Sequence, residues 1–365
     1  MKAVAVFPKG REVKVIDVEE PRCSSPTQVK VRVLEVGVCG TDKEVVEFKH
    51  GRPPEGAEYL IVGHEALGEV VEVGEAVRGL SPGDLVVPRV RRPCPHRACV
   101  PCRTGQTDFC VTGDYLERGI QGAHGFCAEY FVEEASYLHS VPKGLRGVAV
   151  LTEPLTIAEK SLREVSAIQA RLPWARLVPG HAVVLGAGPV GLLGAMVMLR
   201  AGFRTTVYSR GAKPNAKAEL SESLGAPYVS SEENPPEALV RQQGLADVVY
   251  EAAGSPEAAF SIMEALGPNG VCILTGVPGP GDKQELDAAG LMLRWVLKNQ
   301  VVLGTVNAAP VDFEAAVRDL EAFQKRWPGK LERILTARHP PEHFAEVVAG
   351  KKGSDIKDVI TFTER

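Results

Sequence analysis

The sequence lacks the features of a secreted, membrane-spanning or nucleic-acid-binding protein. Its 42 lysines and arginines are outnumbered by 46 aspartates and glutamates, and no basic run is present that would bind a polyanion. The opening MKAVAVFPKGREV has no apolar segment followed by a cleavage site, so we expect no secretory leader. One uncharged run, residues 182–199, is long enough to span a bilayer, but its glycines and proline indicate a strand, a turn and a buried helix. We therefore expect a cytoplasmic protein that binds neither nucleic acid nor membrane.

Cysteine is also scarce, with eight residues in 365, yet four of them fall within the segment PCPHRACVPCRTGQTDFC. Disulfides are disfavoured in the cytoplasm, so such a cluster indicates metal binding. Four thiolates complete the tetrahedral shell of Zn²⁺ and leave no position for a substrate. We expect a structural zinc ion at Cys94, Cys99, Cys102 and Cys110, with His96 and Cys127 as possible substitute ligands.

A second set of donors is mixed in type and could form an open metal site. VGVCGTDKE contains Cys39 beside Thr41, IVGHEALGEVV contains His64 and Glu65, and LTEPLTIAEKS contains Glu153. One thiolate, one imidazole and one or two carboxylates suit Zn²⁺ with a place left for water or an alcohol oxygen. Each side chain alone could instead be structural, but the combination predicts a catalytic zinc, giving two zinc ions per chain.

The pattern of apolar residues along the sequence indicates two kinds of domain. The first half reads as short, valine-rich strands, and from about residue 180 apolar strands alternate with helices. That alternation predicts a parallel sheet with helices on both faces. We predict an α/β protein with a discontinuous β-rich domain over residues 1–178 and 309–365 and a doubly wound domain over residues 179–308.

The segment VVLGAGPVGLLG contains a G-x-G-x-x-G pattern between a predicted strand and a predicted helix. In that context the glycines permit a tight turn, close approach to a pyrophosphate and close helix packing, and the helix N-terminus favours negative charge. A glycine-rich packing seam is the alternative. We expect a dinucleotide site at Gly186, Gly188, Pro189, Val190 and Gly191.

The end of the next predicted strand indicates which dinucleotide binds. The segment TTVYSRGAKP has no carboxylate of the kind that NAD-preferring sites use to accept from the ribose hydroxyls. Ser209, Arg210 and Lys213 offer a hydroxyl and two cations, which suit a phosphate monoester. We expect NADP, with NAD also bound, although Arg210 could instead be a solvated loop residue.

Several motifs occur together and in one order: GVCGTD, GHEALGEVVEVGEAV, GLSPGDLVV, the four-cysteine segment, TEPL and GAGPVGLL. Together they resemble the zinc-dependent medium-chain dehydrogenase/reductase superfamily. Within it, CGTDKEVVEFKHG, RRPC, YLERGIQGAHGF, EPLTIAEKS and GTVNAAP resemble the glucose (aldose) 1-dehydrogenases first described from archaea. The resemblance covers nearly the whole chain and implies a GroES-like catalytic domain, a Rossmann domain and a homodimer or homotetramer.

The resemblance also implies a reaction and its residues. Hydride would pass from C1 of an aldose such as D-glucose to NAD(P)⁺, giving the aldonolactone, and a sorbitol-type polyol dehydrogenase is the alternative. The catalytic zinc would be held by Cys39, His64 and either Glu65 or Glu153. Sugar contacts fall on Thr41, Glu117, Glu153, Glu159 and Asn307. The nicotinamide ring is expected near Gly276, Val277 and Val306, and further cofactor contacts fall on Ala253, Gly254 and Asn307.

Three departures from the family pattern affect these expectations. The gap between Cys94 and Cys99 is four residues instead of two, which changes the turn between the first two zinc-binding cysteines. Val90 and Arg91 stand where some relatives carry a polar sugar contact. Glu44 occupies the position at which many alcohol dehydrogenases have a histidine, so we expect the proton to leave through Thr41 or a carboxylate–water relay.

Overall fold

The computed structural model describes residues 1–174, 180–279, 281, 283–350 and 355–362. The chain forms two compact units, one built from Met1–Thr156 and Asn307–Arg365 and the other from Ile157–Val306. The expected domain border at residues 178 and 179 lies outside the described residues.

The first unit is built around a seven-stranded sheet. Its strands run in the order β11-β6-β5-β3-β19-β18, with β10 also paired to β3. Their bounds are β3 (Gln28–Gly37), β5 (Glu65–Val73), β6 (Leu85–Pro88), β10 (Tyr130–Glu134), β11 (Leu138–Val141), β18 (Leu335–His339) and β19 (Lys357–Thr361). The alternating pattern of QVKVRV explains β3, because Val29, Val31 and Val33 are fully buried on one face. The antiparallel pairing of β19 with β3 joins the C-terminal part of the chain to this sheet.

Two small sheets and several helices complete the first unit. One sheet has the order β2-β1-β4 and the other β7-β8-β9. The strands are β1 (Lys2–Phe7), β2 (Glu12–Asp17), β4 (Leu60–Ile61), β7 (Arg91–Arg92), β8 (Leu116–Arg118) and β9 (Gly122–Ala123). The helices are α1 (Gly40–Val46), α2 (Val100–Arg103), α9 (Pro310–Arg326) and α10 (Phe344–Ala349). Helix α3 (Thr152–Gln169) begins in this unit and continues into the second.

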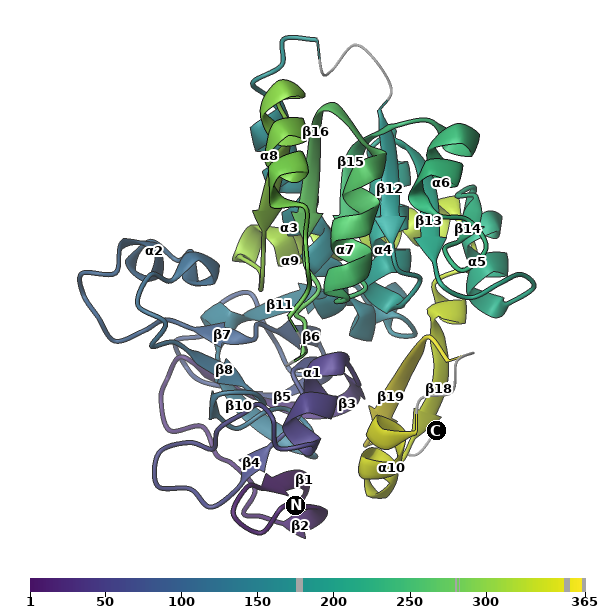
Figure 1. Cartoon of the computed structure of the whole chain (residues 1–365). Coiled ribbons are helices and arrows are strands. Elements are labelled where there is room, and N and C mark those ends of the chain that lie inside the picture. Colours follow the sequence, from purple (N-terminus) through teal and green to yellow (C-terminus); the bar gives the residue numbers. More distant parts are fainter. Residues whose placement is uncertain (175–179, 280, 282, 351–354, 363–365) are drawn as a thin grey trace. The chain divides into compact units, whose positions relative to one another are not determined.

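The second unit is a six-stranded parallel sheet in the order β14-β13-β12-β15-β16-β17. The strands are β12 (His181–Leu185), β13 (Arg204–Ser209), β14 (Tyr228–Ser230), β15 (Ala246–Glu251), β16 (Leu266–Leu274) and β17 (Val301–Gly304). The connecting helices are α4 (Pro189–Arg200), α5 (Ala216–Leu224), α6 (Pro236–Gln243), α7 (Pro256–Ile262) and α8 (Ala288–Leu297), drawn in teal to green in Figure 1. Counted from β12, this is the doubly wound order 3-2-1-4-5-6, with the reversal between β12 and β15. The predicted parallel sheet and α/β class are therefore confirmed.

Candidate metal and cofactor sites

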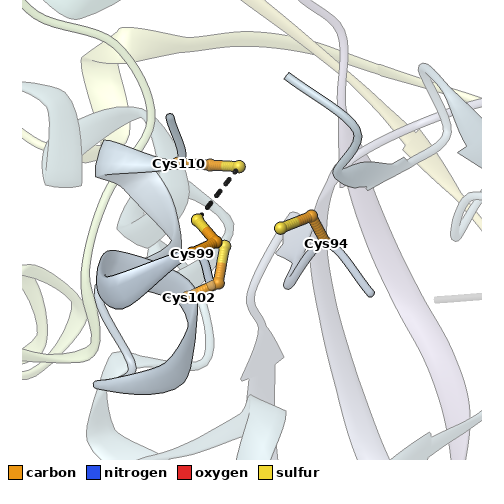
Figure 2. A group of neighbouring side chains, drawn as sticks. All are labelled: Cys94, Cys99, Cys102 and Cys110. Carbon is orange, nitrogen blue, oxygen red and sulfur yellow. Dashed lines mark hydrogen bonds between the residues drawn. The ribbon is translucent and has the colours of Figure 1, made fainter. Parts of the chain in front are cut away.

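The four clustered cysteines converge on one point in the first unit. Their sulfur atoms all lie within 4.8 Å of one another, and the Cys99 and Cys110 sulfurs are 3.9 Å apart. Cys99 caps α2 and Cys102 lies inside it, while the Cys94 sulfur approaches from the opposite side (Figure 2). Four sulfurs at this spacing match the donor set of a closed tetrahedral zinc site.

The lengthened first gap of the cysteine segment is absorbed by a turn, in which the Cys99 amide donates to the His96 carbonyl at 3.0 Å. The His96 ring faces Asp114 on the surface, with 2.9 Å between ring nitrogen and carboxylate oxygen. Cys127 packs in a separate apolar cluster with Val4 and Val38. Within the described part of the chain, neither residue joins the four-sulfur group.

The environment of this cluster favours a thiolate at Cys110. Burial would raise the pKa of Cys110, but hydrogen bonds from the hydroxyl and amide of Thr112 outweigh it and lower the pKa to about 6. A thiolate is the form of cysteine that binds a metal.

The mixed donors also gather in the first unit. The donor atoms of Cys39, His64 and Glu65 all lie within 4.8 Å of one another, with 3.1 Å between the Cys39 sulfur and His64 Nε2. Cys39 caps α1, and its sulfur accepts from the Thr41 amide at 3.3 Å. The pair is supported by Asp42, whose carboxylate accepts from the Cys39 amide at 2.9 Å and lies 3.6 Å from His64 Nδ1.

Neighbouring charges and burial change the pKa values of two side chains in this region, and both values are raised. Burial would lower the pKa of His64, but the neighbouring Cys39 and Asp42 outweigh it and raise the pKa well above its usual value. The Glu153 residue is partly exposed, but its carboxyl group is surrounded by protein. Burial of that group, together with the charge of Glu65, raises its pKa to about 7. Glu153 thus lies near the three donors but outside the tight group.

A buried lysine that no sequence motif predicted completes this site. Lys357, at the start of β19, is fully buried and forms an ion pair with the Glu65 carboxylate. The two side chains meet across Gly37 on the intervening strand β3, where an added Cβ would lie 2.2 Å from Glu65 Oε2 and 2.8 Å from Lys357 Cε. The ion pair therefore needs glycine at residue 37.

Two of the expected sugar contacts lie together although they are 190 residues apart in sequence. Asn307 Nδ2 donates to Glu117 Oε1 at 3.1 Å, and Asn307 Oδ1 accepts from the Ala308 amide at 2.8 Å. Asn307 adopts a left-handed backbone (φ 60°), which asparagine tolerates better than most residues. Arg91 holds the same Glu117 oxygen through Nε and Nη2, at 3.0 and 2.9 Å. Glu159, also expected at the sugar, is buried in the second unit.

The glycine pattern after β12 has the geometry of a dinucleotide turn. Gly186 has a φ of 106°, which favours glycine. Gly188 caps α4 and has nothing within 4 Å of an added Cβ, so its backbone is open to a ligand. A Cβ at Gly191 would lie 2.2 Å from the Gly186 carbonyl oxygen, so only glycine allows helix and turn to touch. Pro189 and Val190 form the first helical residues.

The residues expected at the cofactor's adenosine end lie at the end of β13. Ser209 is the last residue of that strand, and Arg210 and Lys213 are exposed just beyond it. Lys213 forms an ion pair with Glu222 on α5. In the described part of the chain no acidic group pairs with the Arg210 side chain, which leaves its guanidinium free for a ligand.

The other residues expected to bind the cofactor follow strands β15, β16 and β17. Ala253 and Gly254 follow β15, and Gly276 and Val277 follow β16. Val306 follows β17, and its carbonyl accepts from the buried Lys160 at 2.9 Å. These positions lie at the carboxyl ends of the parallel strands, where ligands of doubly wound sheets bind.

Two family models match this chain, one in each part of the sequence. Residues 25–143 match the family model for the alcohol dehydrogenase GroES-like domain, which agrees with a GroES-like unit joined to a Rossmann sheet. Residues 146–362 match the model described as glucose dehydrogenase C-terminus. The chain belongs to the glucose 1-dehydrogenase family of zinc-dependent medium-chain dehydrogenases/reductases, as its motifs predicted.

Individual relatives match along their whole length. The glucose 1-dehydrogenase of Methanocella arvoryzae is 42% identical over 361 residues, covering 99% of both chains. The glucose 1-dehydrogenase of Thermoproteus tenax is 42% identical over 363 residues, again covering 99% of both. The structure of Haloferax mediterranei glucose dehydrogenase in complex with NADP, Zn and gluconolactone is similar with a TM-score of 0.89, at 36% identity and full coverage of both chains. In the described residues no helix has the length and apolarity to cross a membrane.

Proposed function

We propose that this chain is a zinc-dependent glucose 1-dehydrogenase that transfers hydride from C1 of D-glucose or a similar aldose to NADP⁺, giving the aldonolactone. The observation that carries the proposal is the full-length similarity to a glucose dehydrogenase whose solved structure contains NADP, Zn and gluconolactone. The grouping of Cys39, His64 and Glu65 supports it, because these donors suit an open zinc site.

The residues present fit a catalytic zinc ion. Cys39 and His64 would hold it, with Glu65 or Glu153 as the third protein ligand. When bound, the ion would lower the pKa of the sugar's C1 hydroxyl. Asp42 Oδ1 lies 3.6 Å from His64 Nδ1, and a carboxylate beside the second ring nitrogen is the arrangement that orients a metal-binding histidine. The Thr41 hydroxyl lies in the first turn of α1 beside Cys39 and would pass on the proton.

The structural zinc is assigned to Cys94, Cys99, Cys102 and Cys110, so the chain would bind two zinc ions. Support comes from the mutual approach of the four sulfurs and the lowered pKa of Cys110. A site with four protein ligands stabilises the fold and leaves the chemistry to the open site.

Substrate recognition is assigned to polar side chains, since a sugar offers many hydroxyl groups and little apolar surface. In the first unit, Glu117 and Asn307 share a hydrogen bond, so together they present both acceptors and a donor to a vicinal diol. No described residue donates to Glu117 Oε2, which leaves that oxygen for a sugar hydroxyl. Thr41, Glu153 and Glu159 complete the proposed set.

Cofactor binding is assigned to the turns at the carboxyl end of the parallel sheet. Gly186, Gly188, Pro189, Val190 and Gly191 would bind the pyrophosphate at the start of α4. Ser209, Arg210 and Lys213 would bind the 2′-phosphate of NADP, and NAD would bind without that contact. The nicotinamide half would contact Ala253, Gly254, Gly276, Val277, Val306 and Asn307.

The proposed domains span residues 1–178 with 309–365 and residues 179–308, supported by the position of the parallel sheet between His181 and Gly304. We propose a homodimer, or a homotetramer built from it, because α8 exposes a continuous apolar face beside the edge strand β17. Met292, Leu293, Val296 and Leu297 are 60 to 71% exposed, and such a face on a protein surface marks an interaction site. A cytoplasmic location is also proposed, since reducing conditions keep zinc-binding thiols available.

A kinetic screen tests the proposal. Purified protein with measured zinc content is assayed with glucose, galactose, xylose and sorbitol, each with NADP⁺ and with NAD⁺. Aldose oxidation with a higher kcat/KM for NADP⁺ supports the proposal. Oxidation of sorbitol in preference to every aldose would instead make the chain a polyol dehydrogenase, and no turnover by zinc-loaded protein would refute both readings.

A further inference from the structure

A buried carboxylate without a cationic partner lies at the carboxyl end of the parallel sheet. Glu251 is the last residue of β15 and is 1% exposed. Its Oε1 accepts from the backbone amides of Ala253 and Gly254, each at 2.7 Å, and its Oε2 accepts from the Gly276 amide at 3.0 Å. Across the described residues no lysine, arginine or histidine pairs with it. Three amide groups therefore replace the water that the carboxylate loses on burial.

These hydrogen bonds join two loops that are separate in sequence. Ala253 and Gly254 belong to the loop after β15, and Gly276 belongs to the loop after β16. The backbone of Glu251 reinforces the link, because its carbonyl accepts from the amide and hydroxyl of Thr275, at 3.1 and 2.7 Å. Figure 1 shows the two strands side by side, so both loops start from the same edge of the sheet.

The two loops also touch directly through their backbones. An added Cβ at Gly276 would lie 2.3 Å from the Gly254 nitrogen and 2.9 Å from Glu251 Oε2. Gly254 has a φ of 67°, so a larger residue there would be strained. The glycines let the loops approach, and the Glu251 side chain fixes how they meet.

We propose that Glu251 is a positioning residue for the nicotinamide half of the dinucleotide site, an inference that rests on the proposed function. The loops that its side chain joins are those of Ala253, Gly254, Gly276 and Val277, the residues assigned to that half. An ionised carboxylate accepts at both oxygens, so it binds amides from two loops at once. A glutamine at this position would turn an N–H group toward one of the loop amides. The turn at Gly186 and the end of β13, which would bind the other half of NADP, receive no hydrogen bond from this side chain.

The test compares NADPH with a fragment that lacks nicotinamide. Full-length, zinc-loaded Glu251→Gln is titrated with NADPH by fluorescence and with adenosine 2′,5′-bisphosphate by calorimetry. We expect the Kd of NADPH to rise about ten-fold or more, as for loss of a hydrogen bond to a charged group, while the Kd of the fragment stays unchanged. Glu257→Gln is the matched control, since Glu257 is exposed in the first turn of α7 and its loss changes the net charge equally.

A second variant covers the case in which Glu251→Gln fails to fold. Glu251→Asp keeps the charge and can still accept from Ala253 and Gly254, but its shorter side chain withdraws from Gly276. It should fold and show the same selective loss of NADPH affinity. Equal weakening of NADPH and the fragment, or no weakening of either by a folded variant, would overturn the inference. Failure of the wild-type protein to bind NADPH would instead refute the proposed function.

Discussion

Replacing Arg91 by methionine should both destabilise the protein and weaken its affinity for glucose. Arg91 on β7 pairs with Glu117 on β8 in the register of the small sheet, and the two side chains are only 4% and 12% exposed. The guanidinium also donates to the Asp108 carbonyl at 3.3 Å and lies 3.7 Å over the Tyr115 ring. Breaking a buried ion pair by removing one partner costs about 3–5 kcal/mol, because it leaves the other charge uncompensated.

The effect on glucose follows from the position of Glu117. In the wild-type protein Arg91 and Asn307 both hold Oε1, so the other oxygen has a fixed direction. Without Arg91 only the Asn307 amide remains, and the carboxylate can turn away from a sugar hydroxyl. A site built to bind substrate hydroxyls loses much of its affinity when a partner is misplaced, so we expect the KM for glucose to rise by about ten-fold or more.

A double variant separates the two effects. Glu117→Gln added to Arg91→Met removes the uncompensated charge, so it should recover much of the free energy of unfolding lost in the single variant. It should not recover the KM for glucose. Arg103→Met replaces an exposed arginine at the end of α2; it is the control and should resemble the wild type in both measurements. A lower free energy of unfolding in Arg91→Met with an unchanged KM for glucose would refute the sugar-binding argument.

Three further substitutions test the cysteine cluster, the cofactor site and a partly buried histidine. Cys99→Ser should lower the zinc content by about one ion per chain and lower the Tm, with turnover per folded molecule near normal; lost turnover at an unchanged Tm would contradict a structural role. Arg210→Ala should weaken NADP binding by about 1–3 kcal/mol and leave NAD nearly unaffected, whereas equal losses would assign Arg210 to the adenine or the fold. Burial and the nearby Arg89 lower the pKa of His139 from 6.5 to about 4. The neutral ring therefore contributes fully to the free energy of unfolding above pH 6.5, and this contribution is lost as the pH falls toward 4. This is worth up to about 3 kcal/mol, and His139→Phe should flatten the free energy of unfolding over that range, while parallel curves for both proteins would rule the effect out.

Local patterns predicted the parts of the protein whose geometry is set by neighbours in sequence. The spacing of Cys94, Cys99, Cys102 and Cys110 predicted one cluster, because the segment is short enough that a turn and a single helical turn bring the sulfurs together. The same holds for Gly186, where the strand–turn–helix order is read from consecutive residues. A strand of period two and a helix of period 3.6 are both visible within one segment.

Contacts that depend on pairing between distant strands could not be predicted. Lys357 opens the strand sequence KDVIT and reaches Glu65 only because β19 pairs with β3, which pairs with β5. In the sequence Gly37 resembles any strand glycine, and only the structure shows that the side chains of Glu65 and Lys357 meet above it. Arg91 was considered only in place of a sugar contact, whereas its side chain turns to Glu117. Single-sequence patterns carry no information on register between segments that lie hundreds of residues apart.

The charges around Cys39 explain why the groups of this site have displaced pKa values. Asp42, Glu65 and Glu153 bring three acidic groups into a buried region beside the Cys39 thiol, and within the described residues the fixed cation there is Lys357, paired with Glu65. The excess negative charge raises the pKa of His64, and with burial it raises that of Glu153 to about 7, so protons partly neutralise the region. A divalent cation would supply the same compensation without protons and would reverse both shifts, since it favours the ionised carboxylate and the neutral imidazole. Because Lys357 already forms an ion pair with Glu65, we expect the carboxylate of Glu153 to be the more available of the two for binding a metal ion.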